Sequence, residues 1–256
     1  MSRTAPLQAI IFDVDGTLAD TEFSHMAAFN EAFQHENLNW QWDTATYTKL
    51  LDVSGGKERI AHYWKQIQPG LKSIGSGAFA DTVQRIHDQK TAAYERMVAE
   101  GAVKLRPGVL TLIEQAFTAD IRLAIATTTS KVNVSSLLRQ AIGLNWSDYF
   151  SVIEDASTAP QKKPHPQAYI QTLARLSLPA GACIAIEDSA NGLKAAMAAG
   201  LATVITLNSF TEHHDFSGAL CVLPSLAQTS LAKLTELHVA APTKNIRRPQ
   251  PIFCAP

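Results

Sequence analysis

Cysteine and charge are both scarce in this chain, and each scarcity excludes a class of protein. The three cysteines, Cys183, Cys221 and Cys254, are scattered and lack metal-ligand spacing, so the sequence does not predict a cysteine-bound zinc site. Charged residues make up 18% of the 256 residues and sum to a net charge of −1, which excludes a polycationic nucleic-acid surface. The 46% share of hydrophobic residues is typical of a globular protein and excludes wholesale disorder.

Long hydrophobic runs are missing as well. No apolar stretch is long enough to span a bilayer, and the residues before the first apolar run leave no room for a signal sequence. We therefore expect a cytoplasmic protein that binds neither membranes nor nucleic acids and acts as a monomer. The length allows one domain with an insertion, or two domains.

The first apolar run ends in two carboxylates. Residues 9–12 are apolar, as in a strand that is covered on both faces of a parallel sheet, and Asp13 and Asp15 follow directly. Because they stand two apart, the carboxylates project to the same side of an extended chain, and Gly16 lets the backbone turn away. Two acids this close need a cation, or one of them must keep its proton. The pair predicts a metal-bound nucleophile beside a general acid.

Two other structures would also place acids at this point. The acids could cap a turn at the strand end, and this motif by itself does not exclude that alternative. A calcium-binding loop would need glycine at its sixth position and glutamate at its twelfth. Counted from Asp13, these positions hold Leu18 and Ser24, so the calcium loop is excluded.

Helical patterns alone fill the chain from residue 20 to residue 101, and strands alternate with helices only after residue 106. The later apolar runs predict strands at residues 123–126, 149–153, 183–186, 202–207 and 220–223, with a last helix over 225–238. We predict an α/β fold: a doubly wound, Rossmann-like parallel sheet with an inserted all-helical domain. The expected division is a core of residues 1–19 and 102–240, a helical insertion of residues 20–101, and a mobile tail of residues 241–256.

Polar residues that suit a phosphate follow two of the later apolar runs. Thr127, Thr128 and Thr129 stand at a strand end before a helix, where hydroxyls and free amides point the same way. Threonine is also common in strands, so a purely structural role is an alternative. Pro164 forces Lys163 into an extended conformation, which presents its ammonium from a fixed point. Glu187 and Asp188 end another apolar run, where sheets of this class bind ligands.

The helical insertion contains its own candidate anion site. Ser54, Gly55, Gly56 and Lys57 form a turn that leads into a helix, and amides at a helix start favour anions. A turn between helices with solvated charges is the alternative. The place of this turn beside the two strand-end acids favours the anion site.

Taken together and in order, these segments resemble the haloacid-dehalogenase superfamily. The resemblance includes the hexapeptide of residues 13–18, Thr127 after a strand, Lys163 before Pro164, and the pair Glu187 and Asp188. It covers nearly the whole sheet and is specific to the subgroup with a helical cap, which includes phosphoglycolate phosphatase and β-phosphoglucomutase. By this resemblance Asp13 is the nucleophile that forms an aspartyl-phosphate, and Asp15 is the general acid and base. Mg²⁺ would be bound by Asp13, Asp188 and the backbone carbonyl of Asp15, with Glu187 nearby.

The cap resembles that of the CbbY proteins, which are phosphatases linked to the Calvin cycle. This resemblance rests on the tryptophan-containing segment of residues 39–43, on Tyr47 and on residues 54–60. It implies a small sugar phosphate as substrate, specifically xylulose 1,5-bisphosphate, with the second phosphate at Ser54, Gly55, Gly56 and Lys57. It also implies that Asp20 and His25 lie on the hinge side and contact substrate hydroxyls.

Three other functions share these motifs. A β-phosphoglucomutase-like phosphomutase would use the same residues and return the phosphate to the sugar. A phosphoglycolate phosphatase would hydrolyse a smaller ester. A catalytically silent sugar-phosphate sensor is disfavoured, because a sensor needs neither an attacking carboxylate nor a proton donor.

Overall fold

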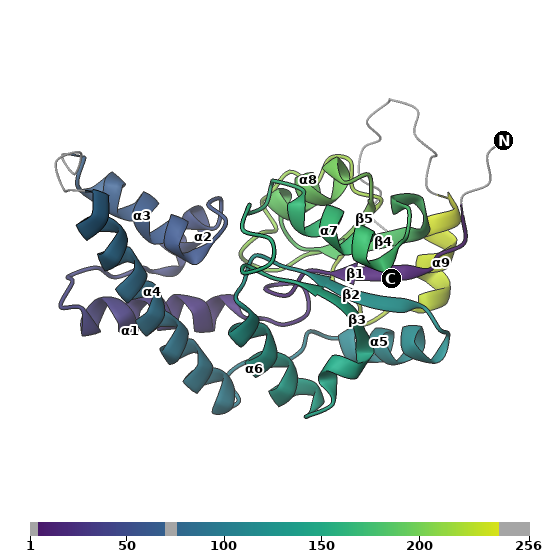
Figure 1. Ribbon diagram of the computed structural model, residues 1–256, viewed down its shortest axis with the longest axis horizontal. Helices are drawn as coiled ribbons and strands as arrows, with labels where there is room; N and C mark the ends of the chain where they lie inside the picture. Colours follow the sequence, from purple (N-terminus) through teal and green to yellow (C-terminus); the bar gives the residue numbers. More distant parts are fainter. Residues whose placement is uncertain (1–4, 70–75, 241–256) are drawn as a thin grey trace.

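The computed structural model describes residues 5–69 and 76–240 (Figure 1). Its centre is one parallel sheet of six strands in the order β3-β2-β1-β4-β5-β6. The strands are β1 Ala9–Phe12, β2 Arg122–Ala126, β3 Phe150–Glu154, β4 Cys183–Glu187, β5 Ala202–Thr206 and β6 Cys221–Leu223. The expected α/β fold with a central first strand is confirmed. The tail expected at residues 241–256 lies outside the described residues.

Strand β1 is buried on both faces, and its side chains alternate between two hydrophobic clusters. Ile10 and Phe12 belong to one cluster, whereas Ala9 and Ile11 belong to the other. Phe12 pairs with Ile125 of β2 and with Ile186 of β4. These three strands therefore end at the same level, so the polar residues that follow each of them meet at one edge of the sheet.

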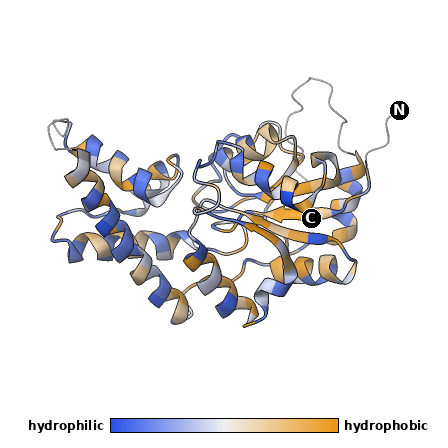
Figure 2. Cartoon of the chain, in the orientation of Figure 1, coloured by the Kyte–Doolittle hydropathy of each residue, from blue (hydrophilic) through white to orange (hydrophobic). Residues whose placement is uncertain are grey.

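Helices cover both faces of the sheet. Residues of α5 (Val109–Thr118), α6 (Lys131–Ile142) and α9 (Leu231–Ala240) contribute to the first cluster. Residues of α7 (Gln167–Leu176) and α8 (Ala190–Ala198) contribute to the second, and Figure 1 shows α5 and α6 on one side of the sheet and α7 and α8 on the other. Figure 2 shows the strongest hydrophobic colour on the strands between these layers. Short 3₁₀ helices, Trp146–Tyr149 and Ala180–Ala182, precede β3 and β4.

The last helix starts later than its sequence pattern suggested. It begins at Leu231 rather than at residue 225, because the Ser230 hydroxyl accepts a hydrogen bond from the Lys233 amide at 3.2 Å. Among the described residues, none of the helices combines the length and the apolar character that crossing a bilayer would take.

All regular structure in the described part of residues 20–101 is helical. The four helices are α1 Glu22–His35, α2 Thr44–Leu50, α3 Gly56–Ile67 and α4 Ser76–Ala99, and Figure 1 shows them beside the sheet. They share a hydrophobic cluster of their own that is rich in aromatic residues, including Phe29, Phe33, Trp42 and Tyr47. We call this helical unit the cap. Phe210, from the loop after β5, also packs into this cluster.

The two chain segments that join the cap to the sheet run side by side. Ala19 and Leu105 form an antiparallel bridge, and the Arg106 amide donates to the Leu18 carbonyl at 2.9 Å. The Arg106 guanidinium, which is almost fully buried, donates to the Gly16 carbonyl at 2.6 Å. The Arg106 side chain therefore joins the segment that returns from the cap to the turn that follows Asp13 and Asp15, the predicted catalytic acids.

Candidate active site

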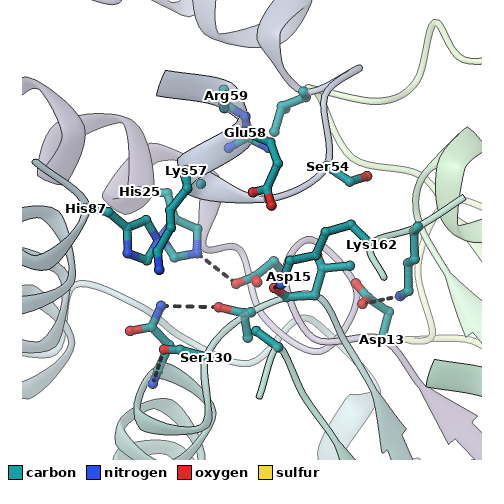
Figure 3. Close-up of a pocket in the computed structure, with 18 of the residues that line it drawn as sticks. Asp13, Asp15, His25, Ser54, Lys57, Glu58, Arg59, His87, Ser130 and Lys162 are labelled. Carbon is teal, nitrogen blue, oxygen red and sulfur yellow. Dashed lines mark hydrogen bonds and ion pairs between the residues drawn. The ribbon is translucent and has the colours of Figure 1, made fainter. Parts of the chain in front are cut away.

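A cavity of about 510 Å³ lies between the cap and the carboxyl edge of the sheet. Figure 3 shows its lining, with Lys57, His25 and His87 on the cap side and Asp13 and Lys162 on the side of the sheet. The structure brings together most of the residues predicted for the site. Those that line the cavity are Asp13, Asp15, His25, Ser54, Gly55, Gly56, Lys57, Thr128, Thr129, Lys163 and Asp188.

Three predicted site residues do not line the cavity. Asp20, predicted to contact substrate, instead has its carboxylate 3.0 Å from the Arg106 Nε, with 66% of its side chain exposed. Thr127 is buried, and its Oγ1 accepts a hydrogen bond from the Thr129 amide at 3.2 Å. Glu187 is fully buried and is not part of the lining. Asp20 pairs instead with Arg106, which lies in the segment that returns from the cap to the sheet. The spacing of the two residues in the sequence does not reveal this contact.

Lys163 links the predicted nucleophile to Glu187. Its Nζ donates to Asp13 Oδ1 at 2.6 Å and to Glu187 Oε1 at 2.5 Å. Burial opposes the charge on Lys163, but the two carboxylates outweigh burial and raise the pKa of the ammonium above its ordinary value. The Tyr169 hydroxyl also donates to Glu187 Oε1 at 2.6 Å, which fixes the position of this carboxylate. Lys163 therefore remains charged next to Asp13.

The acids at the sheet edge form a group that fits a metal ion. Asp13, Glu187 and Asp188 each offer an oxygen, and these oxygens lie within 4.8 Å of one another. Burial, with Glu187 adding to it against the opposing charge of Lys163, raises the pKa of Asp13 to about 7. Burial and the charges of Asp13 and Glu187 raise the pKa of Asp188 well above its ordinary value. A divalent cation with hard oxygen ligands would relieve this repulsion, so the residues fit Mg²⁺.

Contacts around Asp188 fix the position of this carboxylate in the acidic group. Asn208 donates from Nδ2 to Asp188 Oδ2 at 2.7 Å, which orients this carboxylate. Gly16 has a φ of +76°, and a Cβ at this position would lie 2.4 Å from Asp188 Oδ2. Both the backbone conformation and the space therefore require glycine between Asp15 and the following turn.

Asp15 faces the cap rather than the acidic group. Its Oδ1 lies 2.8 Å from His25 Nε2, and His25 Nδ1 lies 2.8 Å from Lys90 Nζ. Because the Lys90 ammonium can only donate, His25 Nδ1 accepts and Nε2 carries the proton that points at Asp15. Burial would raise the pKa of Asp15, but His25 and Lys90 outweigh it and lower the pKa to about 2. Asp15 is thus ionised in this arrangement.

The cap side of the cavity is built around the turn at residues 54–57. Helix α3 begins at Gly56, and a Cβ on this glycine would lie 2.7 Å from His87 Nε2. Burial and the charges of Lys90 and Lys57 lower the pKa of His87 to about 3, so this imidazole is neutral near pH 7. Figure 3 shows the Lys57 side chain beside His87.

A further polar chain runs through the cap at the edge of the cavity. The Tyr47 hydroxyl donates to Glu22 Oε2 at 2.7 Å and accepts from Arg59 Nη1 at 3.1 Å. Glu22 and Arg59 line the cavity. Tyr47 is fully buried, and it was predicted only as part of the cap resemblance.

Several ionisable residues that line the cavity were not among the predicted site residues. They are Glu22, Glu58, Arg59, His87, Lys90, Lys131 and Lys162. His87 and Lys90 stand three apart on α4, which places them on one face, but nothing in the sequence shows that this face meets His25. A signal did exist for Lys162, because it directly precedes Lys163.

The chain matches the haloacid dehalogenase-like hydrolase family over residues 7–200. It belongs to this family, and the expected family and the expected phosphatase class of enzyme are confirmed. The plasmid protein CbbY of Cupriavidus necator is 49% identical over 220 residues, which cover 86% of this chain and 86% of that protein.

Two further relatives extend the comparison. A solved structure of a CbbY variant from Rhodobacter sphaeroides in complex with xylulose-(1,5)bisphosphate is 41% identical, with a TM-score of 0.80. The match covers 89% of this chain and 99% of that chain. A β-phosphoglucomutase of Bacillus subtilis is 26% identical over 199 residues, which cover 77% of this chain and 82% of that protein.

Proposed function

We propose that the protein is a Mg²⁺-dependent phosphatase that hydrolyses a sugar bisphosphate, with xylulose 1,5-bisphosphate as substrate, through an aspartyl-phosphate on Asp13. The observation that carries this proposal is one cavity with two sets of groups that suit a phosphate. Asp13, Lys163 and the acidic group lie at the sheet edge, and Lys57 lies on the cap side. The CbbY relative that holds xylulose-(1,5)bisphosphate supports the choice of substrate.

The first half of the proposed reaction uses Asp13 and Asp15. A carboxylate oxygen of Asp13 attacks phosphorus, the bond from phosphorus to the sugar oxygen breaks, and Asp15 gives this oxygen a proton. In the second half water attacks the aspartyl-phosphate and loses its proton to Asp15, which frees phosphate and the Asp13 carboxylate. Lys163, held at 2.6 Å from Asp13, balances negative charge on the transferring group.

Asp15 must first acquire the proton that it gives to the sugar, because it is ionised in this structure. The hydrogen-bonded series Lys90, His25 and Asp15 provides a route for it. His25 passes its Nε2 proton to Asp15 and takes one at Nδ1 from Lys90. Burial lowers the pKa of Lys90 to about 8, so this ammonium gives up a proton more readily than an exposed lysine does.

In this proposal Asp13, Asp188 and the backbone carbonyl of Asp15 would hold Mg²⁺, with Glu187 nearby. When bound, the ion supplies positive charge to the phosphate oxygens and lets the anionic phosphate approach the carboxylates. Lys163 and the residues that orient Asp188 act whether or not the ion is bound. The raised pKa values of Asp13 and Asp188 support this ligand set.

The cap would bind the phosphate that does not react. Amides at the start of α3, the Ser54 hydroxyl and the Lys57 ammonium suit this anion, and Lys162 reaches the same cavity from the core. We also propose that residues 20–101 move as a domain over a core of residues 1–19 and 102–240. Closure of the cap would bring both phosphate sites onto one bisphosphate.

A phosphomutase is the second candidate, because the β-phosphoglucomutase relative is similar over most of this chain. The two functions differ in whether water or a sugar hydroxyl takes the phosphate from Asp13.

One assay tests the proposed function and separates the two candidates. Sugar mono- and bisphosphates are incubated with the enzyme and Mg²⁺, and both free phosphate and isomeric sugar phosphates are measured. We expect one phosphate per bisphosphate consumed, with xylulose 1,5-bisphosphate among the best substrates, and no release by Asp13→Asn, since an amide is a far poorer nucleophile. An isomeric sugar phosphate without free phosphate would support the mutase. Substantial turnover by Asp13→Asn would contradict the mechanism.

A further inference from the structure

A side chain of α8 joins the turn that carries Ser54 and Lys57 to the core. Asn191, in the first turn of that helix, donates from Nδ2 to the Asp52 carbonyl at 2.9 Å. The same Nδ2 lies 3.3 Å from the Ser54 Oγ. Both acceptors belong to the cap, and Ser54 immediately precedes Gly55. This side chain therefore bridges the two units beside the cavity.

A second core residue supports the same point of the cap. His214 Nδ1 accepts a hydrogen bond from the Ala190 amide at 3.2 Å, so its Nε2 carries the proton. This Nε2 lies 3.5 Å from Asp52 Oδ1. Burial and the neighbouring charge of His213 lower the pKa of His214, which favours the neutral imidazole beside Asp52. Asp52 is thus contacted at its backbone oxygen by Asn191 and at its carboxylate by His214.

The place of Asn191 in the chain connects this contact to the acidic group. Asn191 follows Asp188 by three residues, and Ser189 between them caps α8 by accepting from the Gly192 amide at 3.1 Å. A rigid first turn of α8 therefore stands between the proposed metal ligand and the cap turn. The contacts are polar and lie at the surface, so they can form and break without exposing a hydrophobic core.

We propose that Asn191 is a positioning residue that holds residues 52–57 of the cap at a fixed place over Asp13. It acts through Asp52 and Ser54 and does not touch the reacting atoms. Its effect on turnover rests on the proposed function, because only a substrate that reaches the cap turn gains from the position of that turn. Its effect on the turn itself does not depend on any substrate.

The first test measures amide hydrogen exchange of residues 52–57 in the protein without substrate. Asn191→Ala removes both hydrogen bonds, and Asn191→Asp keeps the size of the side chain but cannot donate. We expect both variants to exchange about 3- to 10-fold faster over this turn than the wild type, as the loss of one such hydrogen bond predicts. Lys194→Ala, an exposed residue of the same helix, is the matched control and should exchange like the wild type.

The second test compares two substrates. For a sugar bisphosphate, both Asn191 variants should lose about 5- to 10-fold in kcat/KM, mostly through KM, because the second phosphate meets a displaced turn. For p-nitrophenyl phosphate, which does not reach the turn, kcat/KM should stay within about twofold of the wild type. A fold-wide defect would lower both values together and would overturn the positioning role.

The outcomes separate this proposal from the proposed function. Unchanged exchange over residues 52–57 in both Asn191 variants would overturn the role of Asn191, whatever the activity. If the wild type hydrolyses no sugar bisphosphate, the proposed function fails, and the exchange comparison still decides whether Asn191 holds the turn.

Discussion

At the scale of single residues, the structure assigns different surroundings to the two acids of the first motif. Asp13 lies against Lys163, Glu187 and Asp188, whereas Asp15 lies against His25 of the cap. Opposite environments move the pKa of Asp13 up to about 7 and that of Asp15 down to about 2. Neighbours in sequence thus take part in different networks: a bound cation would favour the ionised form of Asp13 that the nucleophile needs, and Asp15 must take up a proton before it can act as general acid.

Replacing Asp15 tests its proton-transfer role. Asp15→Asn keeps the shape and the contact with His25 but can neither give nor take a proton at the required atom. We predict a loss in kcat of on the order of 10²- to 10⁴-fold with sugar bisphosphates. With p-nitrophenyl phosphate, which has a good leaving group, Asp15→Asn should slow the formation of the aspartyl-phosphate less. A burst of nitrophenol measures the rate of this step. A variant as fast as the wild type would remove Asp15 from this role.

His87 gives a prediction for stability against pH. Its folded-state pKa is about 3, below the ordinary 6.5. Between these values the unfolded chain binds a proton that the folded chain does not, so the free energy of unfolding falls as pH falls below 6.5. From pH 7 to pH 5 this group should account for a loss of about 2 kcal/mol. We predict that His87→Gln reduces the pH dependence by about this amount in urea unfolding at the two pH values.

The exposed His62 of α3 provides the control for this measurement. His62→Gln should leave the difference in unfolding free energy between pH 7 and pH 5 as it is in the wild type. If His87→Gln also leaves it unchanged, His87 does not resist protonation in the folded protein.

At the scale of elements, the strand ends and the cap turn differ in how far the sequence reveals them. Asp13, Thr127 and Asp188 could be placed together because parallel strands of similar length end at one edge. The cap residues could not be placed in this way. His25 and Lys90 are 65 residues apart, and only the packing of α1 on α4 brings them within 2.8 Å. Asp20 was predicted toward the substrate, but Arg106 lies next to it.

The cap turn yields a prediction about Lys57. If its ammonium binds the second phosphate, Lys57→Ala removes a charge-assisted contact and should lower kcat/KM for a bisphosphate by about 10- to 100-fold. A monophosphate should barely be affected. Lys65→Ala, on the same helix but outside the cavity lining, serves as the control. Equal losses on xylulose 1,5-bisphosphate and on p-nitrophenyl phosphate would defeat the assignment of the second phosphate to Lys57.

At the scale of the whole molecule, one cavity draws on two units, and the helical one is inserted in the sequence of the other after the first strand. The sheet supplies the acids and Lys163, and the cap supplies Lys57, His87 and the His25 network. The change in sequence pattern at residue 20 and after residue 101 predicted a division into core and cap. The contacts between the units depend on side-chain packing across the cavity, which periodicity does not report.

The acidic group of Asp13, Glu187 and Asp188 gives a prediction for metal removal. EDTA should abolish phosphate release and Mg²⁺ should restore it, because buried carboxylates repel an incoming phosphate. Mg²⁺ should also raise the midpoint of thermal unfolding near pH 7.5, since it binds the folded state at carboxylates that repel one another. Asp188→Asn should lose most of this shift. Full activity in excess chelator would refute the metal dependence.

The most direct test of the central claim compares kcat/KM for phosphate release from xylulose 1,5-bisphosphate with that from xylulose 5-phosphate under the same conditions with Mg²⁺. If one cavity binds both phosphates, as we propose, the bisphosphate should be favoured by on the order of 10- to 100-fold, in line with one additional charge-assisted phosphate contact. Equal values for the two substrates, or no release from the bisphosphate, would contradict the claim.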